Sequence, residues 1–208
     1  MMTLGVAALA SPVAAEDRLE LWLNPALSAA LDDKSFVELE VAQRYREAPA
    51  DDTHYARLWI GRTIADGVTL SGGAERRREG SGRETRLLQQ VGYPLLGRIK
   101  GRTRIEQRFI KGAERTAWRL RQRIGITLPL SQRADFWSLV ANAEGFLTLR
   151  ASNDRGDKGL TGLRTFVGVE REYRRIDVSV GYLRQQAIRR DAPDVVGHAP
   201  FVGLTFKL

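Results

Sequence analysis

Residues 97–129 read GRIKGRTRIEQRFIKGAERTAWRLRQRIGITLP, and their side chains alternate in character. In the first half, one set of alternate positions is apolar or small: Ile99, Gly101, Thr103, Ile105 and Phe109. The other set is charged: Arg98, Lys100, Arg102, Arg104, Glu106 and Arg108. The second half repeats this, with Trp118, Leu120, Ile124, Ile126 and Leu128 on one face and Arg119, Arg121 and Arg123 on the other. A period of two residues is that of a β-strand, so the stretch predicts a hairpin with one apolar and one charged face.

The length of these two strands favours a membrane over water. A half-buried strand of a soluble sheet also alternates, but ordinary strands average about 5–6 residues. Each run here lasts about ten residues or more, which is what a tilted strand needs to cross a bilayer. We therefore predict an all-β fold, an antiparallel transmembrane β-barrel.

The composition sets limits on the class of protein. The 208 residues are enough for one domain and too few for two domains of comfortable size. No cysteine is present to form a disulfide or a thiolate metal site. Lys and Arg exceed Asp and Glu by 8, which by itself points to an anionic partner. No stretch of 18 apolar residues occurs, which excludes helical membrane spans.

The first residues resemble a secretory signal. Residues 4–10 are apolar and small, and Val13, Ala14 and Ala15 end like a cleavage site, although no Lys or Arg precedes them. We predict a signal peptide over residues 1–15 and a single barrel domain over residues 16–208. A true start upstream is one explanation for the missing Lys or Arg. The alternative is an Ala-rich tail.

Eleven alternating segments can be counted, which predicts a barrel of ten to twelve strands. Breaks near residues 47–54, 76–84, 111–115, 151–159 and 189–197 are mostly longer or polar, and those near 32–35, 65–67, 94–97, 129–135 and 173–175 are mostly tighter. This predicts extracellular loops and periplasmic turns, respectively, with residues 76–83 as a solvated loop. Because such barrels favour even strand numbers, residues 19–31 are expected inside or over the barrel, unless a twelfth strand exists.

Facing strands should place the charged side chains in one lumen. The predicted lumen network consists of Arg98, Arg102, Arg104, Glu106, Arg108, Arg119, Arg121, Arg123, Glu38, Glu40, Glu144 and Glu170. A turn at residues 113–116 would set Glu106 opposite Arg123 and Gln107 opposite Gln122. Aromatic residues near strand ends, such as Trp22, Trp59, Trp118, Trp137 and Tyr182, would form girdles at the membrane interfaces.

Catalytic and metal sites find little support in the sequence. The two histidines, His54 and His198, both lie beside loop-like sequence without an adjacent nucleophile motif. Two histidines and no cysteine disfavour a transition-metal site, and no phosphate-loop motif occurs. We predict no enzyme activity, no cofactor and no metal.

The stretches RETRLLQQ (83–90), GRTRIEQRF (101–109) and WRLRQR (118–123) resemble a bacterial family known as domain-of-unknown-function family twenty-four-ninety. The likeness runs from residues 21–24 (LWLN) to the C-terminus. It implies an outer-membrane-barrel-like architecture and supplies no catalytic residue. The C-terminal residues resemble a barrel-assembly signal, except that Leu208 is not aromatic.

Three functions stay open at this point. The first is a barrel of the bacterial outer membrane with an Arg-rich lumen, either a structural envelope protein or a narrow, anion-favouring pore. Its expected partners are outer-membrane lipid and lipopolysaccharide, the barrel-assembly machinery and small anions, with nucleic acid not favoured. The second is a secreted, soluble, basic β-protein that binds polyanions, and the third is a lipid-modifying barrel enzyme.

Overall fold

The computed structural model describes residues 16–132 and 136–208, and these residues form eleven long strands. The strands are β1 (Glu16–Ala30), β2 (Ser35–Arg46), β3 (Thr53–Ala65), β4 (Val68–Glu79), β5 (Gly82–Leu96), β6 (Ile99–Ile110), β7 (Ala117–Pro129), β8 (Ser138–Arg150), β9 (Gly159–Tyr173), β10 (Ile176–Ala187) and β11 (Val195–Lys207). A short 3₁₀ helix, η1 (Pro49–Asp51), lies between β2 and β3. No helix in the described residues is long and apolar enough to cross a bilayer. The predicted signal peptide, residues 1–15, lies outside the described residues.

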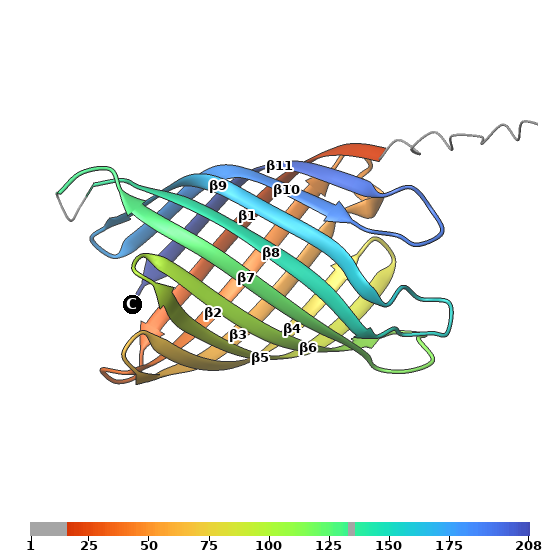
Figure 1. Cartoon of the computed structure of the whole chain (residues 1–208), viewed down its shortest axis with the longest axis horizontal. Helices are drawn as coiled ribbons and strands as arrows, with labels where there is room; N and C mark the ends of the chain where they lie inside the picture. The colour runs from red at the N-terminus through yellow and green to blue at the C-terminus, as the bar shows by residue number, and fades with distance from the viewer. Residues whose placement is uncertain (1–15, 133–135) are drawn as a thin grey trace, which may run out of the picture.

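The sheet closes into a barrel through a parallel seam. Each strand from β1 to β11 pairs antiparallel with its neighbour in sequence, and β1 pairs parallel with β11. In an up-and-down barrel with an odd number of strands, the first and last strands run in the same direction, so the closing pair must be parallel. The expectation that residues 19–31 lie inside or over the barrel, or that a twelfth strand exists, is therefore wrong. The segment is β1, a full member of the wall (Figure 1).

The two ends of the barrel differ in their connections. At one end, here called the turn end, lie the connecting residues 31–34, 66–67, 97–98, 130–132, 136–137 and 174–175, together with Leu208. At the other, the loop end, strands are joined by residues 47–52, 80–81, 111–116, 151–158 and 188–194, and β1 begins there (Figure 1). The predicted grouping of breaks is confirmed, but the solvated loop at residues 76–83 is wrong. Only Gly80 and Ser81 separate β4 from β5, and Gly80 adopts a left-handed φ of 55°.

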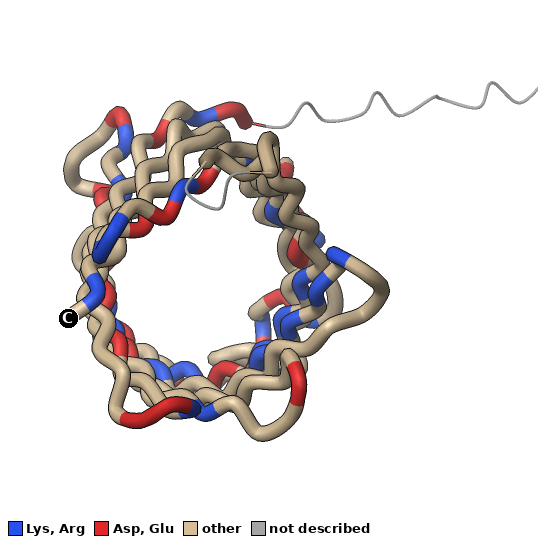
Figure 2. Tube along the Cα trace, turned by 90° about the vertical axis from the view of Figure 1, so that its left-hand side faces the viewer, with Lys and Arg blue, Asp and Glu red and all other residues tan. Residues whose placement is uncertain are grey.

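The wall is apolar outside and charged inside. Outward side chains such as Ile60 and Ile124 are 57% and 51% exposed, whereas the inward Glu75 and Glu106 are 2% and 1% exposed. Successive residues of a strand point to opposite faces, so the alternation read from the sequence becomes this division. Figure 2, which looks along the barrel from the turn end, shows basic and acidic positions distributed around the ring.

The register of the central hairpin differs from the predicted one. Glu106 lies opposite Arg119 rather than Arg123, and Gln107 lies opposite Trp118 rather than Gln122. The connection occupies residues 111–116, and Gly112 takes a φ of 80° with the Ala113 amide bonded to the Ile110 carbonyl at 3.1 Å. The chain therefore reverses earlier than predicted, because glycine adopts this left-handed conformation without a steric penalty.

Two of the aromatic residues assigned to the membrane interfaces lie in the lumen. Trp22 and Trp59 are 2% and 5% exposed, so their placement in the girdles is wrong. Trp59 lies opposite Gly73 on β4, where an added Cβ would come within 2.6 Å of the indole ring. The missing side chain at Gly73 thus makes room for an indole inside the barrel.

Candidate functional site

Three buried glutamates lie at the centre of the lumen, and the first of them is Glu75 on β4. Its cross-strand neighbours are Arg57 on β3 and Arg86 on β5. A carboxylate oxygen of Glu75 lies 2.5 Å from Arg57, and the other lies 2.8 Å from Arg77 and 3.4 Å from Arg86. Opposite charges directly across a ladder stabilise strand pairing, so Glu75 links three neighbouring strands.

Glu106 on β6 holds a second group of arginines. Its carboxylate oxygens lie 2.6 Å from Arg119 and 2.8 Å from Arg121, both on β7. Arg86 on β5 approaches the same carboxylate at 3.9 Å. Because Arg86 also contacts Glu75, the two glutamates belong to one ion-pair network.

Glu144 on β8 continues the network to β9. Arg121 donates to it at 2.5 Å, Arg102 also donates to it, and Arg164 on β9 lies 3.8 Å away. At the opposite end of the network, Arg57 reaches Glu40 on β2 at 2.8 Å. Carboxylates and guanidinium groups therefore alternate without a break across the barrel, from β2 to β9.

Two smaller groups lie nearer the loop end. Glu84 receives hydrogen bonds from Arg86 at 2.7 Å and Arg108 at 2.5 Å. Arg46 lies 3.0 Å from Glu20 and 3.2 Å from Glu79. These contacts fix the strand ends where the loops begin.

Three other arginines in the lumen make no ion pair with a described residue: Arg44, Arg104 and Arg123. The guanidinium carbon of Arg44 lies 3.7 Å from the centre of the Trp22 ring, and the Nε of Arg44 has no hydrogen-bond partner. Arg104 donates to the Gln90 side-chain oxygen at 2.6 and 2.9 Å and lies over Trp59 at 4.8 Å. A cation over an indole face is attracted by the ring quadrupole, which offsets part of the missing counter-charge.

The network separates two cavities. A chamber of about 610 Å³ lies toward the turn end and is lined by residues including Arg44, Arg104, Arg121 and Arg123. A smaller cavity of about 160 Å³ lies toward the loop end, lined by Arg46, Arg77, Arg86 and Arg108 among others. Arg44, Arg121 and Arg164 line both, so these three side chains form the partition between them.

The mouth of the chamber has the opposite charge character. A third cavity, of about 630 Å³, opens there and shares Glu38, Glu40, Glu170 and Arg123 with the chamber. Glu172 and Asp177 also line it. Acidic side chains therefore gather at the turn end, whereas the cavity at the loop end is lined mainly by arginines.

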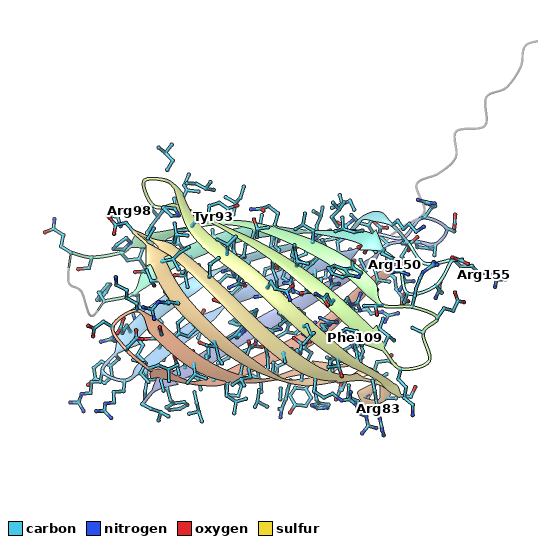
Figure 3. The ribbon with its side chains drawn as sticks, turned by 90° about the horizontal axis from the view of Figure 1, so that it is seen from below. Arg83, Tyr93, Arg98, Phe109, Arg150 and Arg155 are labelled. Atoms are coloured by element: carbon cyan, nitrogen blue, oxygen red, sulfur yellow. The ribbon has the colours of Figure 1, made fainter. Side chains whose placement is uncertain are left out.

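The predicted lumen residues fall into two sets. Members of the ion-pair network or its branch at Glu84 are Arg102, Glu106, Arg108, Arg119, Arg121, Glu40 and Glu144. The others line the chamber without an ion pair to a described residue: Arg98, Arg104, Arg123, Glu38 and Glu170. Arg98 is exposed and belongs to the turn between β5 and β6, at the turn end beside Tyr93 (Figure 3).

Ten further charged residues of the lumen and its loop end were not predicted from the sequence: Glu20, Arg44, Arg46, Arg57, Glu75, Arg77, Glu79, Glu84, Arg86 and Arg164. The alternation of Tyr55, Arg57 and Trp59 with Leu58 and Ile60 could have revealed Arg57. Treating residues 76–83 as a loop hid Arg77. Aromatic residues at alternate positions with arginine are the signal for this kind of lumen.

Neither histidine belongs to the lumen network, and both lie on the outer face of the barrel wall. His198 Nε2 is 3.4 Å from Asp17, and its Nδ1 contacts the Tyr182 hydroxyl. His54 meets Tyr45 edge-on, with ring centres 6.3 Å apart. In the described part of the chain, no group of three or more His, Cys, Asp and Glu residues could hold a metal ion.

Comparison with known proteins gives a family and one relative. No solved structure matches the chain. An uncharacterised protein of Methylorubrum extorquens is 27% identical over 199 residues, covering 90% of this chain and 85% of the relative. The profile of the family described as "Protein of unknown function (DUF2490)" matches residues 19–196, which include every glutamate and arginine of the central network, and the chain belongs to that family.

Proposed function

We propose that this protein is a β-barrel of the bacterial outer membrane with a lumen closed across its middle, a structural envelope protein that passes few or no solutes. The observation that carries the proposal is the division of the wall. Large apolar side chains are exposed on the outside while Glu75, Glu106 and Glu144 are buried inside. A soluble barrel would bury its apolar face, whereas a membrane barrel presents that face to lipid.

The strand lengths support the membrane. The strands have 12 to 15 residues, as in β2 and β5. About 9–11 residues are needed for a tilted strand to span the hydrocarbon region, so both ends would extend into the headgroup layers. At the loop end, Arg83, Arg150 and Arg155 are exposed near the rim, where they would meet phosphate groups of lipopolysaccharide (Figure 3).

The partition of Arg44, Arg121 and Arg164 supports the closed lumen. These side chains lie between the two cavities, and Glu106 and Glu144 hold Arg121 from two sides. Any path that opens past them would be lined by guanidinium groups, which keep their charge at all physiological pH values. Residual current should therefore favour anions over cations.

Fractionation and conductance test the two parts of the proposal. A membrane barrel should stay in the pellet after carbonate extraction and show heat-modifiable gel mobility. The competing reading, a secreted polyanion-binding protein, predicts release by carbonate and no such mobility change. In planar bilayers we expect small or no steps, with anion selectivity wherever current is seen, whereas large, cation-selective steps would refute the closed lumen.

A pair of substitutions sharpens the conductance test. Arg44→Ala combined with Arg164→Ala should remove two of the three partition side chains and raise the conductance, while Glu144 keeps Arg102 and Arg121. The matched control is Arg76→Ala combined with Arg78→Ala, because both of these arginines are exposed on β4. Equal conductance in the two double variants would show that the partition lies elsewhere.

A lipid-modifying activity would need a nucleophile at one of the histidines. The contacts of His198 run to Tyr182 and Asp17, and that of His54 runs to the Tyr45 ring. The proposal therefore assigns no catalytic step to this chain. Release of fatty acid from phospholipid vesicles by the purified barrel, lost on His198→Ala, would contradict it.

A further inference from the structure

The chamber at the turn end contains guanidinium groups that lie within ion-pair distance of no described carboxylate. Arg44 and Arg104 are 6% and 4% exposed, and neither lies within ion-pair distance of a described carboxylate. Arg123 also lines the chamber and makes no ion pair with a described residue. A guanidinium group cannot shed its proton, so burial without a counter-ion has a persistent free-energy cost.

The hydrogen bonds of these arginines with described residues use only some of their donors. Gln90 accepts from Nε and one terminal nitrogen of Arg104, and an arginine carries five N–H donors in all. The Nε of Arg44 is buried without a partner, while its guanidinium lies against Trp22. The Nε of Arg102, whose terminal nitrogen bonds Glu144, is likewise unsatisfied. Donors of this kind bind the paired oxygens of a carboxylate or phosphate.

The same chamber also has apolar walls. Phe166 and Phe201 pack edge to face with ring centres 5.3 Å apart, and both line it. Phe36 lines it from the other side of the seam, on β2. A volume of about 610 Å³ lies within the range of small-molecule sites, which combine apolar walls with a few polar groups that orient the ligand.

We propose that the chamber binds a small organic anion, a single carboxylate carried on an apolar body, with the carboxylate at Arg44 and Arg104 and the body against the phenylalanines. Glu38 and Glu170 lie at the mouth and repel anions. An inorganic ion of high charge is repelled most strongly, and it has no apolar group whose burial would offset that repulsion. The ligand would reach the chamber from the turn end. This route rests on the proposed function, because it assumes that the partition closes the lumen beyond the chamber.

Tryptophan fluorescence of the barrel, folded in an uncharged detergent, tests this proposal. Trp22 and Trp59 line the chamber, so they should report occupancy. The probes are benzoate and octanoate, with benzylamine as the control of opposite charge and inorganic phosphate as the control without an apolar body. We expect saturable binding of the two carboxylates only. Tighter binding of benzoate would indicate an aromatic ligand, and tighter binding of octanoate would indicate an acyl ligand.

Substitutions identify the groups that bind. Arg44→Gln and Arg104→Gln should each weaken carboxylate binding about tenfold or more, as loss of a charge-assisted hydrogen bond implies. Both variants should still fold, because neither removes an ion pair between described residues, and heat-modifiable mobility checks this. Arg76→Gln is the matched control, since Arg76 is exposed and its side chain bonds Thr85 on the outer wall.

Each outcome decides the proposal. Folded wild-type protein that binds neither carboxylate, or that binds benzylamine or phosphate equally well, overturns it. So does unchanged carboxylate binding by both lumen variants, which would show that Arg44 and Arg104 serve the fold alone. The titration uses folded protein in detergent, so large conductance in a bilayer would refute the closed lumen without altering the binding result.

Discussion

The arginines of the lumen occupy two different environments, even where they face each other on neighbouring strands. Arg121 contacts both Glu106 and Glu144 at 2.8 and 2.5 Å, while Arg104, directly opposite on β6, has Gln90 as its hydrogen-bond partner among the described residues. Like charges opposed across a ladder are destabilising, so each such pair requires compensation. The glutamates compensate Arg121. The arginines with carboxylate partners link neighbouring strands, whereas those without a described carboxylate partner are the ones to which the proposed ligand would bind.

The largest expected effect is at the centre of the paired set. Glu106→Gln would leave Arg119 and Arg121 without one of their carboxylates in the lumen. Removing one partner of a buried ion pair costs about 3–5 kcal/mol, so we expect a loss of unfolding free energy of that size. Urea unfolding of the barrel in detergent measures it.

The matched control for this experiment is Glu114→Gln, an exposed residue in the connection between β6 and β7. Its unfolding free energy should match that of the wild type, because an exposed charge contributes little. If Glu106→Gln were as stable as this control, the distinction between paired and unpaired arginines would lose its basis.

The fold could be predicted further from the sequence than the site could. Alternation in residues 97–129 defined which side chains face inward, because strand geometry depends only on local periodicity. The contacts between strands could not be derived in this way. Glu106 was assigned to Arg123 and pairs with Arg119, since the register depends on where the chain turns, and Gly112 turns it early.

The same limit applies to closure and to the lumen aromatics. Bacterial barrels usually have an even number of strands, so the sequence alone favoured a place inside or over the barrel for β1. The pairing with β11 assigns β1 to the wall. Tryptophan is common both at membrane interfaces and beside cations, so Trp22 and Trp59 could be placed only once the neighbours Arg44 and Arg104 were known.

The second prediction compares the two faces of one strand. Ile105 is outward and exposed, and Arg104 beside it is buried in the lumen. Ile105→Arg should lower the unfolding free energy by about 2–4 kcal/mol if the residue lies near the bilayer midplane. Arg104→Gln should change it far less, since Arg104 has no ion pair with a described residue to lose. Folding titrations into lipid vesicles measure both, and equal losses would contradict the assignment of the faces.

The third prediction concerns Gln90, which accepts hydrogen bonds from Arg104. Gln90→Leu removes the oxygen to which Arg104 donates at 2.6 and 2.9 Å. Leaving buried donors unsatisfied costs about 1–3 kcal/mol, so we expect a loss of stability in that range. Gln89→Leu is the control, because Gln89 is the exposed neighbour on the outer face. Benzoate added to the Gln90→Leu variant should restore part of the stability if the ligand satisfies Arg104, whereas equal behaviour of the two variants would exclude a role for Gln90.

The smallest expected effect lies outside the lumen, at Asp32 in the turn between β1 and β2. The Lys34 amide donates to its carboxylate at 2.8 Å, and this hydrogen bond, with others from Ser35 and the charge of Arg62, holds the pKa of Asp32 below its usual range. A carboxylate with a lowered folded pKa stabilises the protein above its unfolded pKa, and that contribution is lost as the pH falls through the folded value. The stability difference between wild type and Asp32→Asn should therefore shrink as the pH falls below about 3.9, the ordinary pKa of an aspartate.

Salt separates this exposed turn from the paired lumen. Asp32 and Arg62 are both exposed and lie 3.3 Å apart, so about 1 M salt should screen their attraction. The loss caused by Glu106→Gln should persist in the same salt, because Glu106 is 1% exposed and the surrounding wall keeps ions away from it. Asp33→Asn, at the exposed neighbouring position, is the control for general charge effects. If salt reduced the Glu106 and Asp32 effects in equal proportion, the lumen would be open to solvent ions, and the buried network could not be the element that closes the barrel.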